Sequence, residues 1–162
     1  MVVTSPGKGS QLATLEELPI AEVFEPDQLA RIASLVEALD CDADAALFEP
    51  GDDADALFVV LSGRVSLTMQ VPGREPTIVA SLSRGDIFGW EALRSEAVRT
   101  TTARASKATR CLRCDGDALR RQCELDHELG YRIMSHAFDI VVGELSNTRV
   151  QLLDIYGYGQ QP

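Results

Sequence analysis

The stretch from residue 85 to residue 105, GDIFGWEALRSEAVRTTTARA, contains residue types that suit the recognition of a phosphate group. Gly89 permits a ligand to approach the backbone closely, and the sequence WEAL after it can form one turn of helix. Arg99 offers a planar fork of hydrogen-bond donors that matches the geometry of phosphate oxygens. These residues therefore predict a phosphate site that is centred on Arg99.

The charge distribution favours a small anionic ligand over a polyanion. The chain has 15 basic and 25 acidic residues, and its formal net charge is −10. Within this acidic chain, basic residues outnumber acidic ones between Arg94 and Arg121. For most of these basic residues a solvated strand face is the alternative explanation. Because an acidic protein has little nonspecific attraction for polyanions, we predict no direct nucleic-acid binding and no membrane binding.

Several other functional classes lack support in the sequence. The longest apolar run, ALFVVL at 56–61, is too short for a transmembrane helix, and the first residues do not resemble a signal peptide. A cytoplasmic protein with reduced cysteines is therefore expected. The short signatures of hydrolases, zinc proteases and kinases do not occur, so we expect no enzyme and predict no catalytic residue.

The cysteines leave two interpretations open. Cys111, Cys114 and Cys123, together with His127, supply ligand types for zinc or an iron–sulfur cluster, or thiols for a redox sensor. If the segment around Cys111 is a strand, however, Cys111 and Cys114 point to opposite faces. We therefore predict no metal site and interpret the cysteines as small buried hydrophobic residues, with a metal or redox sensor as the alternative.

The elements around the phosphate site change in character along the chain. Residues 1–12 lack hydrophobic periodicity and are expected to form a disordered leader. Apolar residues between 15 and 39 follow a helical spacing, which predicts a short helix and then one of about three turns, with Pro26 in its first turn. Between Cys41 and Cys114, glycines at 51, 63, 73 and 85 separate short apolar segments. That spacing predicts an antiparallel β sandwich or barrel.

A long helix is predicted from about residue 125 to residue 156, after a helix capped by Asp115 and before a tail at 157–162. Its two apolar stripes consist of Leu129, Ile133, Ala137 and Ile140, and of Met134, Phe138, Val141 and Leu145. A helix that covers only its own domain needs one such stripe. The second stripe predicts a homodimer through this helix. A helix wedged between the barrel and the N-terminal helices is the alternative.

Three segments resemble the cyclic-nucleotide-binding domain of catabolite-activator-type bacterial regulators, protein kinase A regulatory subunits and gated ion channels. They are LFEPGDDADALFVVLSGRVSL at 47–67, LSRGDIFGWEAL at 82–93 and VRTTTARA at 98–105. The resemblance covers about residues 15–156 and implies a mainly β fold with flanking α elements. This fold is an antiparallel β jelly roll with N-terminal helices and a long C-terminal helix. We then expect one domain over 13–156, which includes a dimerisation helix at about 125–156.

The resemblance also implies that this region contains a phosphate-binding cassette and that cAMP or cGMP is the ligand. The expected binding residues are Gly89, Glu91, Ala92, Leu93, Arg99 and Thr100. The short helix would present backbone N–H groups to the cyclic phosphate. In the family, a glutamate directly after the glycine accepts a hydrogen bond from the ribose 2′-hydroxyl. Here Trp90 has that place, and Glu91 follows one residue later.

Three hypotheses follow from this departure. In the first, Glu91 takes the ribose role through a local shift. In the second, Trp90 stacks on a base or fills the space of the sugar. In the third, Arg99 pairs with Glu91 or Glu96 and the pocket is vestigial.

The resulting interpretation is a stand-alone regulatory or sensor domain that binds cAMP, cGMP or a related phosphate ligand. It would signal through its C-terminal helix to an unknown effector protein. Glu144 and Thr148 on that helix are candidates for contact with the base. Because the chain ends shortly after the helix, the helix-turn-helix domain of the family's activators is not expected. The alternative is a ligand-free dimeric protein-interaction module with a degenerate pocket.

Overall fold

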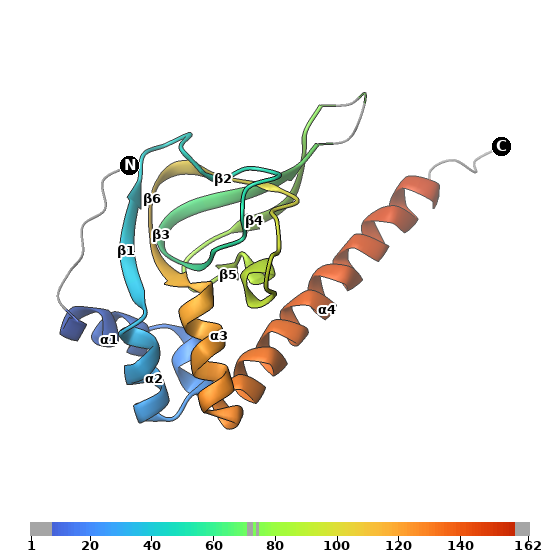
Figure 1. Cartoon of the computed structure of the whole chain (residues 1–162). Coiled ribbons are helices and arrows are strands. Elements are labelled where there is room, and N and C mark those ends of the chain that lie inside the picture. The colour runs from blue at the N-terminus through green and yellow to red at the C-terminus, as the bar shows by residue number, and fades with distance from the viewer. Residues whose placement is uncertain (1–7, 71–72, 74, 158–162) are drawn as a thin grey trace.

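The computed structural model describes residues 8–70, 73 and 75–157, and for residues 8–10 and 147–157 it describes the helical backbone only. The helices are α1 (Lys8–Glu16), η1 (Pro19–Val23), α2 (Pro26–Ala33), η2 (Trp90–Leu93), α3 (Gly116–Leu125) and α4 (His127–Gly157). The strands are β1 (Val36–Cys41), β2 (Ala46–Phe48), β3 (Ala56–Met69), β4 (Thr77–Leu82), β5 (Ile87–Phe88) and β6 (Thr102–Asp115). In Figure 1, α1, α2 and α3 lie at one end of the strands, and α4 projects away from the body.

The strands form one antiparallel sheet with the order β1-β6-β3-β4, in which β2 also pairs with β6 and β5 also pairs with β3. The two longest strands, β3 and β6, pair from Ala56 opposite Asp115 to Thr68 opposite Thr102. The predicted antiparallel jelly roll with flanking helices is thus confirmed. This pairing matters for the site because it places the start of β3 next to the end of β6, where α3 begins.

Two predictions about element boundaries are wrong. The helical spacing predicted to run to Leu39 ends earlier, because Val36–Cys41 is a strand that pairs with β6. A short apolar run fits both periodicities, and the hydrogen bonds that β6 offers determine the outcome. Gly63, predicted as a turn between strands, lies inside β3 at an irregularity of its pairing with β6. Its φ of +92° explains why a glycine stands there.

The structure describes only part of the leader and of the tail that the sequence predicts. Helix α1 begins at Lys8, inside the leader expected over 1–12, whereas residues 1–7 lie outside the described residues. At the other end, α4 continues to Gly157, and residues 158–162 of the expected tail are also outside the described residues. Asp115 caps α3 as predicted, because its side chain accepts a hydrogen bond from the Ala118 N–H at 2.7 Å.

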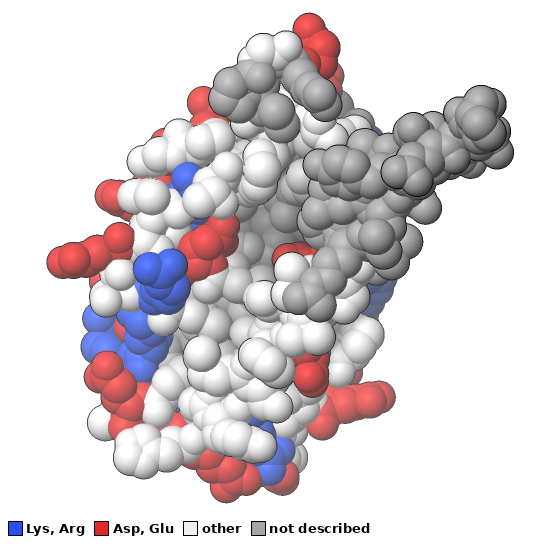
Figure 2. Space-filling model, turned by 90° about the vertical axis from the view of Figure 1, so that its right-hand side faces the viewer, with Lys and Arg blue, Asp and Glu red and all other residues white. Residues whose placement is uncertain are grey.

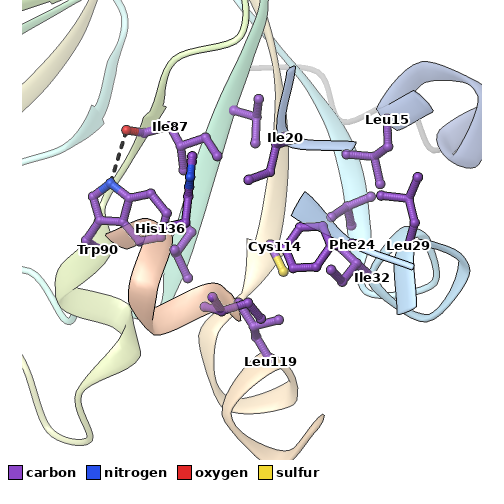
Figure 3. A pocket seen from close by; sticks show the side chains of 14 residues that line it. Leu15, Ile20, Phe24, Leu29, Ile32, Ile87, Trp90, Cys114, Leu119 and His136 are labelled. Atoms are coloured by element: carbon purple, nitrogen blue, oxygen red, sulfur yellow. Dashed lines mark hydrogen bonds between the residues drawn. The ribbon is translucent and has the colours of Figure 1, made fainter. Parts of the chain in front are cut away.

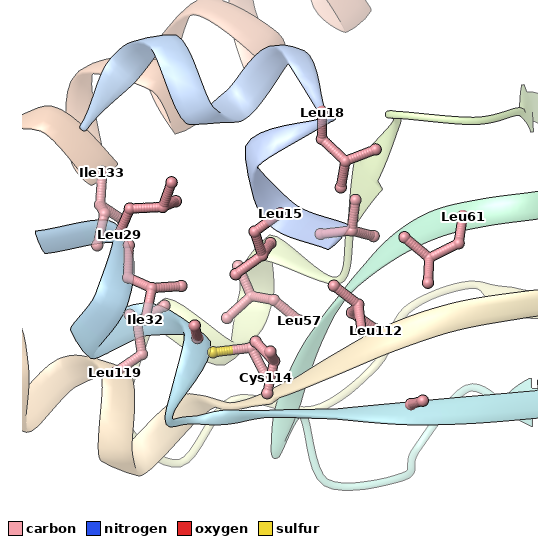
Figure 4. Close-up of a cluster of buried hydrophobic side chains, with 14 of the residues drawn as sticks. Leu15, Leu18, Leu29, Ile32, Leu57, Leu61, Leu112, Cys114, Leu119 and Ile133 are labelled. Atoms are coloured by element: carbon pink, nitrogen blue, oxygen red, sulfur yellow. The ribbon is translucent and has the colours of Figure 1, made fainter. Parts of the chain in front are cut away.

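Two hydrophobic clusters lie on opposite faces of the central strands. Along β3, Leu57 and Val59 belong to the helix-side cluster, which also contains residues of α1, α2, α3 and α4 (Figure 4). The intervening residues Phe58 and Val60 belong to the barrel cluster, inside the jelly roll. This alternation is the period-2 pattern of a strand that is covered on both faces. The segment from Phe88 to Arg99, called the cassette below, lies between the two clusters, since Phe88 belongs to one and Ala92 to the other.

Helix α4 separates the two predicted apolar stripes. Leu129, Ile133 and Ala137 are buried against the body of the domain. The second stripe is exposed, with Phe138 at 68% and Met134 at 56% of their full accessibility. The helix therefore covers its own domain with one stripe and presents the other to its surroundings. None of the helices in the described part of the chain is both long enough and apolar enough to cross a membrane.

Asp126, which lies between α3 and α4, forms hydrogen bonds to α2. Its carboxylate accepts hydrogen bonds from the Leu129 N–H at 3.0 Å, from Arg31 at 2.5 Å and from Gln28 at 3.5 Å. These donors stabilise the charged form, and they lower the pKa of Asp126 from 3.8 to about 2. Because the folded-state pKa is lowered, this contribution to stability is complete above pH 3.8 and disappears as the pH falls toward 2.

We expect Asp126→Asn to lower the urea midpoint of unfolding at pH 7, because asparagine keeps the acceptor for Leu129 but loses the charge that attracts Arg31. The difference from the wild type should shrink as the pH falls below 4. Asp139→Asn is the matched control, because Asp139 is exposed on α4. A difference that persists unchanged at pH 2.5 would contradict the assignment to the charge.

Candidate functional site

The second residue of the cassette is a glycine that the backbone requires. Gly89 connects β5 to η2 with φ +83°, in the left-handed region that L side chains rarely adopt. A Cβ atom at this position would lie 2.9 Å from both the Ala56 carbonyl oxygen and Arg99 Nη1. The glycine thus allows the cassette to approach the start of β3 and the guanidinium at the same time.

Arg99 is buried to 2% exposure between the cassette and the barrel cluster. Its Nη1 donates to the Gly89 carbonyl at 3.2 Å and to Glu91 Oε2 at 3.3 Å, and its Nη2 donates to the Ala56 carbonyl at 2.5 Å. The guanidinium lies 4.2 Å from the ring centre of Phe48, in a cation–π arrangement. Its Nε is buried and has no hydrogen-bond partner in the described part of the chain. One donor of the fork is therefore unused.

The backbone around Arg99 fixes its position on the neighbouring loop. The Arg99 N–H donates to the Asp52 carbonyl at 2.8 Å, and the Arg99 carbonyl accepts from the Gly51 N–H at 2.9 Å. Burial lowers the pKa of the Arg99 guanidinium, and the charges of Glu91 and Asp55 oppose this effect. An arginine keeps its proton under these conditions. The site therefore holds a fixed positive charge inside the protein.

Trp90 and Glu91 lie on opposite sides of the cassette. The Trp90 indole N–H donates to the Ile87 carbonyl at 3.2 Å, and its ring meets the His136 ring of α4 edge-on at 6.1 Å (Figure 3). Trp90 packs against the helix-side cluster, whereas Glu91 reaches Arg99. The hypothesis that Trp90 stacks on a base or fills the space of the sugar stays a prediction, since in this arrangement the ring packs against α4 and the helix-side cluster. Of the two pairings that the third hypothesis names, that of Arg99 with Glu91 is present at 3.3 Å, and the second carboxylate near Arg99 belongs to Asp55 at 4.0 Å rather than to Glu96. The vestigial pocket of that hypothesis stays a prediction.

The other predicted binding residues are not all directed at Arg99. Ala92 is fully buried in the helix-side cluster, and Leu93 packs against the same cluster. Thr100 is exposed. Gly89, Glu91 and Arg99 are thus the predicted residues that the fold brings together.

The site geometry agrees with the comparisons with known proteins. A family model described as the cyclic nucleotide-binding domain matches residues 39–126, more than half of the chain. The chain belongs to this family. It is 32% identical over 118 residues to the cGMP-dependent protein kinase, isozyme 1, of Drosophila melanogaster, which covers 68% of this chain and 15% of that protein. It is 30% identical over 109 residues to the cAMP-dependent protein kinase regulatory subunit of Emericella nidulans, which covers 67% of this chain and 26% of that protein.

A solved cyclic nucleotide-binding domain from Methylobacillus flagellatus has the same fold. The two chains superpose with a TM-score of 0.73 over 99% of this chain and 90% of the other, at 18% sequence identity. The chain spans about a quarter or less of the length of the Drosophila kinase and of the Emericella regulatory subunit. The family and the fold are thereby shown at the level of the domain.

Sequence reasoning missed three contributors to this cyclic nucleotide-binding domain. Phe48 stacks under the guanidinium, the Ala56 carbonyl accepts from it, and Asp55 adds a second negative charge nearby. All three residues lie in the segment at 47–67 that resembles the family, but no spacing in that segment relates them to Arg99. A further contact comes from α3, where Arg120 donates to the carbonyls of Ala92 and, at 3.4 Å, of Arg94. Arg120 thus joins the end of η2 to α3.

The basic segment between 94 and 121 is largely paired with acidic residues. Arg113 contacts Asp55 at 2.7 Å and Glu37 at 3.2 Å, and Arg110 lies 3.6 Å from Asp40. Figure 2 shows blue and red side chains intermixed near one edge of the visible face, with a mostly uncharged centre. These pairs fit the interpretation of a solvated strand face. Arg99 differs from these residues because its side chain is buried rather than solvated.

Helix α4 also approaches the cassette. Partial desolvation raises the pKa of Glu144, and the negative charge of Glu91 raises it further. The side chain of Thr148 lies outside the described residues. Contact of either residue with a base stays a prediction.

The cysteines behave as hydrophobic residues in this structure. Cys111 belongs to the barrel cluster and Cys114 to the helix-side cluster, so the predicted opposite orientation is confirmed. Burial raises the pKa of both thiols to about 12, which disfavours the reactive thiolate. Within the described ranges, no cluster of three or more histidine, cysteine or acidic side chains is arranged to hold a metal ion.

Proposed function

We propose that this domain binds a cyclic nucleotide at Arg99 and acts as a sensor. The supporting observation is the Arg99 Nε, a buried donor that has no partner among the described residues. A buried unpaired donor is costly, and an anionic oxygen from a cyclic phosphate would satisfy it. The same charge is surrounded by backbone carbonyls that hold the fork in one orientation. The residues present therefore fit a phosphate.

Glu91 would change partner when the ligand binds. Its carboxylate lies 3.3 Å from Arg99 Nη1, so an incoming phosphate would compete with it for the guanidinium. Once displaced, Glu91 is the nearest carboxylate of the cassette that can accept a hydrogen bond from a ribose 2′-hydroxyl. The position of Trp90 on the opposite side supports this exchange, because it leaves the pocket side of η2 to Glu91.

The cassette is connected to the C-terminal helices in two places. Trp90 contacts His136 of α4, and Arg120 of α3 holds the carbonyls at the end of η2. A displacement of η2 on binding would therefore change the packing of both helices. We include in the proposal that an effector protein recognises this change.

Calorimetric titration of the full chain with cAMP, cGMP and 2′-deoxy-cAMP tests the proposal. We expect saturable binding of cAMP or cGMP, and about tenfold weaker binding of the deoxy analogue, since the loss of one charged hydrogen bond costs about 1.5 kcal/mol. In Glu91→Ala the difference between cAMP and its deoxy analogue should disappear. A folded, nucleotide-free sample that gives no heat with either cyclic nucleotide would contradict the sensor function.

A ligand-free dimeric interaction module is the second candidate function. It is favoured by the pairing of Arg99 with Glu91, which partly neutralises the pocket without any ligand. Both candidates share a homodimer, which we propose to form through the exposed stripe of Met134, Phe138, Val141 and Leu145. Light scattering measures this association directly, since a dimer has twice the 17.6 kDa mass of the chain.

A further inference from the structure

A cavity of about 70 Å³ lies on the helix side of β3, away from the phosphate pocket. Leu57 and Val59 line it, whereas Phe58 between them faces the barrel and lies near Arg99. The remaining walls come from the N-terminal helices, from β1, β5 and β6, from Trp90 of the cassette, and from α3 and α4 (Figure 3). The cavity is therefore separated from the proposed nucleotide site by the sheet itself.

The chemistry of the walls selects an uncharged apolar occupant. The cavity is lined by aliphatic and aromatic side chains, by Cys114 and by His136. The volume exceeds the roughly 10–15 Å³ that one water molecule needs. A water molecule in a protein interior also needs two to four polar partners. These walls offer few, because the ring nitrogens belong to His136 and Trp90, and the Trp90 N–H already donates to Ile87. Such a space is filled more favourably by hydrocarbon than by water.

We propose that this cavity is a second ligand site, for a small uncharged hydrocarbon-like molecule. An engineered apolar cavity of about 150 Å³ accepts benzene, so a space about half as large admits xenon or a short alkane and is too small to enclose an aromatic ring. The site and the proposed nucleotide site share no side chain, because none of the residues that hold Arg99 lines the cavity.

The occupant would contact two elements at once. Trp90 belongs to the cassette, and Ile133 and His136 belong to α4, and all three line the cavity. A molecule bound between them adds contacts that exist only while α4 is packed against the cassette. Occupancy therefore stabilises the packed arrangement of α4. Trp90 is the only tryptophan of the chain, so its fluorescence reports on the site without labelling.

Isoleucine methyl groups provide the primary test. Ile20, Ile32, Ile87 and Ile133 line the cavity, whereas Ile78 on β4 is 65% exposed and does not. With full-length protein labelled at the isoleucine δ1 methyls, we expect saturable shifts at the four lining residues under xenon pressure, and none at Ile78. Equal shifts at Ile78, or no saturable shift at the lining residues, would overturn the proposal.

A pair of leucine truncations tests the size selectivity. Leu29→Ala enlarges this cavity, while Leu39→Ala makes the same change in the barrel cluster. We expect benzene to shift the lining methyls and the Trp90 emission in Leu29→Ala, and to leave the wild type and Leu39→Ala unaffected. Benzene-induced shifts of the lining methyls in Leu39→Ala, or their absence in a folded Leu29→Ala, would contradict a site at this place.

Discussion

Replacement of Arg99 by alanine lowers the affinity for cyclic nucleotide by about 100-fold or more, because at least two charged hydrogen bonds to the phosphate are lost at about 1.5 kcal/mol each. The effect is large because Arg99 is buried to 2% exposure, where water cannot replace the missing donors. Calorimetric titration with cAMP and cGMP measures the change. Arg99→Lys keeps the charge but loses the fork, so its affinity should fall between those of the wild type and the alanine variant.

The matched control for Arg99 is another arginine that follows it closely in the chain. Arg104 contacts Glu49 at 3.6 Å with a half-exposed side chain, so Arg104→Ala changes the net charge equally without touching the cassette. We expect it to bind like the wild type. An equal loss in both variants would show that general electrostatic attraction, rather than the fork of Arg99, holds the ligand. Unchanged binding by a folded Arg99→Ala would exclude the proposed site.

Stability must be measured beside affinity for Arg99→Ala. The substitution removes the Arg99 donor from the Gly89 and Ala56 carbonyls. The Gly89 carbonyl still accepts from the Ala92 N–H at 3.1 Å, so the cost of about 1–3 kcal/mol for an unsatisfied buried group applies to the Ala56 carbonyl. Thermal unfolding of the variant without ligand gives this cost separately. A fall in affinity at a temperature where the variant is fully folded can then be assigned to the missing contact.

The local patterns of the sequence predicted those features that depend on neighbouring residues. The Asp115 cap needs only the three residues after it, and the two stripes of α4 need only the helical repeat. The pair of Arg99 with Glu91 was also within reach, because eight positions along a turn of helix and a loop connect them. The cap and the stripes therefore followed from the sequence alone, whereas the pairing of Arg99 was one of three hypotheses.

The features that escaped prediction depend on contacts between distant segments. Strand β1 forms because β6, about 70 residues later, offers a partner with matching hydrogen bonds. The Ala56 carbonyl reaches Arg99 only when β3 and β6 have paired, and its backbone oxygen has no signature in the side-chain pattern. The opposite orientations of Trp90 and Glu91 likewise required the position of α4, which supplies His136.

The second large effect concerns Gly63, the glycine that lies inside β3. At φ +92°, a Cβ atom would lie 2.4 Å from Thr109 Oγ1 and 2.5 Å from the Ala108 carbonyl oxygen. Thr109 cannot move freely, because its hydroxyl accepts from the Arg64 N–H and donates its one proton to the carbonyl of Lys107 at 2.6 Å or of Arg64 at 3.0 Å. We expect Gly63→Ala to lower the free energy of unfolding by about 2–4 kcal/mol, since backbone strain of about 1 kcal/mol adds to overpacking.

Gly51 provides the control that separates backbone strain from the clash. It has nearly the same backbone angle, φ +93°, but no atom lies within 4 Å of the position of its Cβ. Gly51→Ala should therefore cost only the strain, about 1 kcal/mol. Urea unfolding of the two variants compares them directly. Equal losses would mean that β3 relaxes around the new methyl group, whereas a larger loss at Gly63 shows that the irregularity in β3 is held in place by its contact with Thr109.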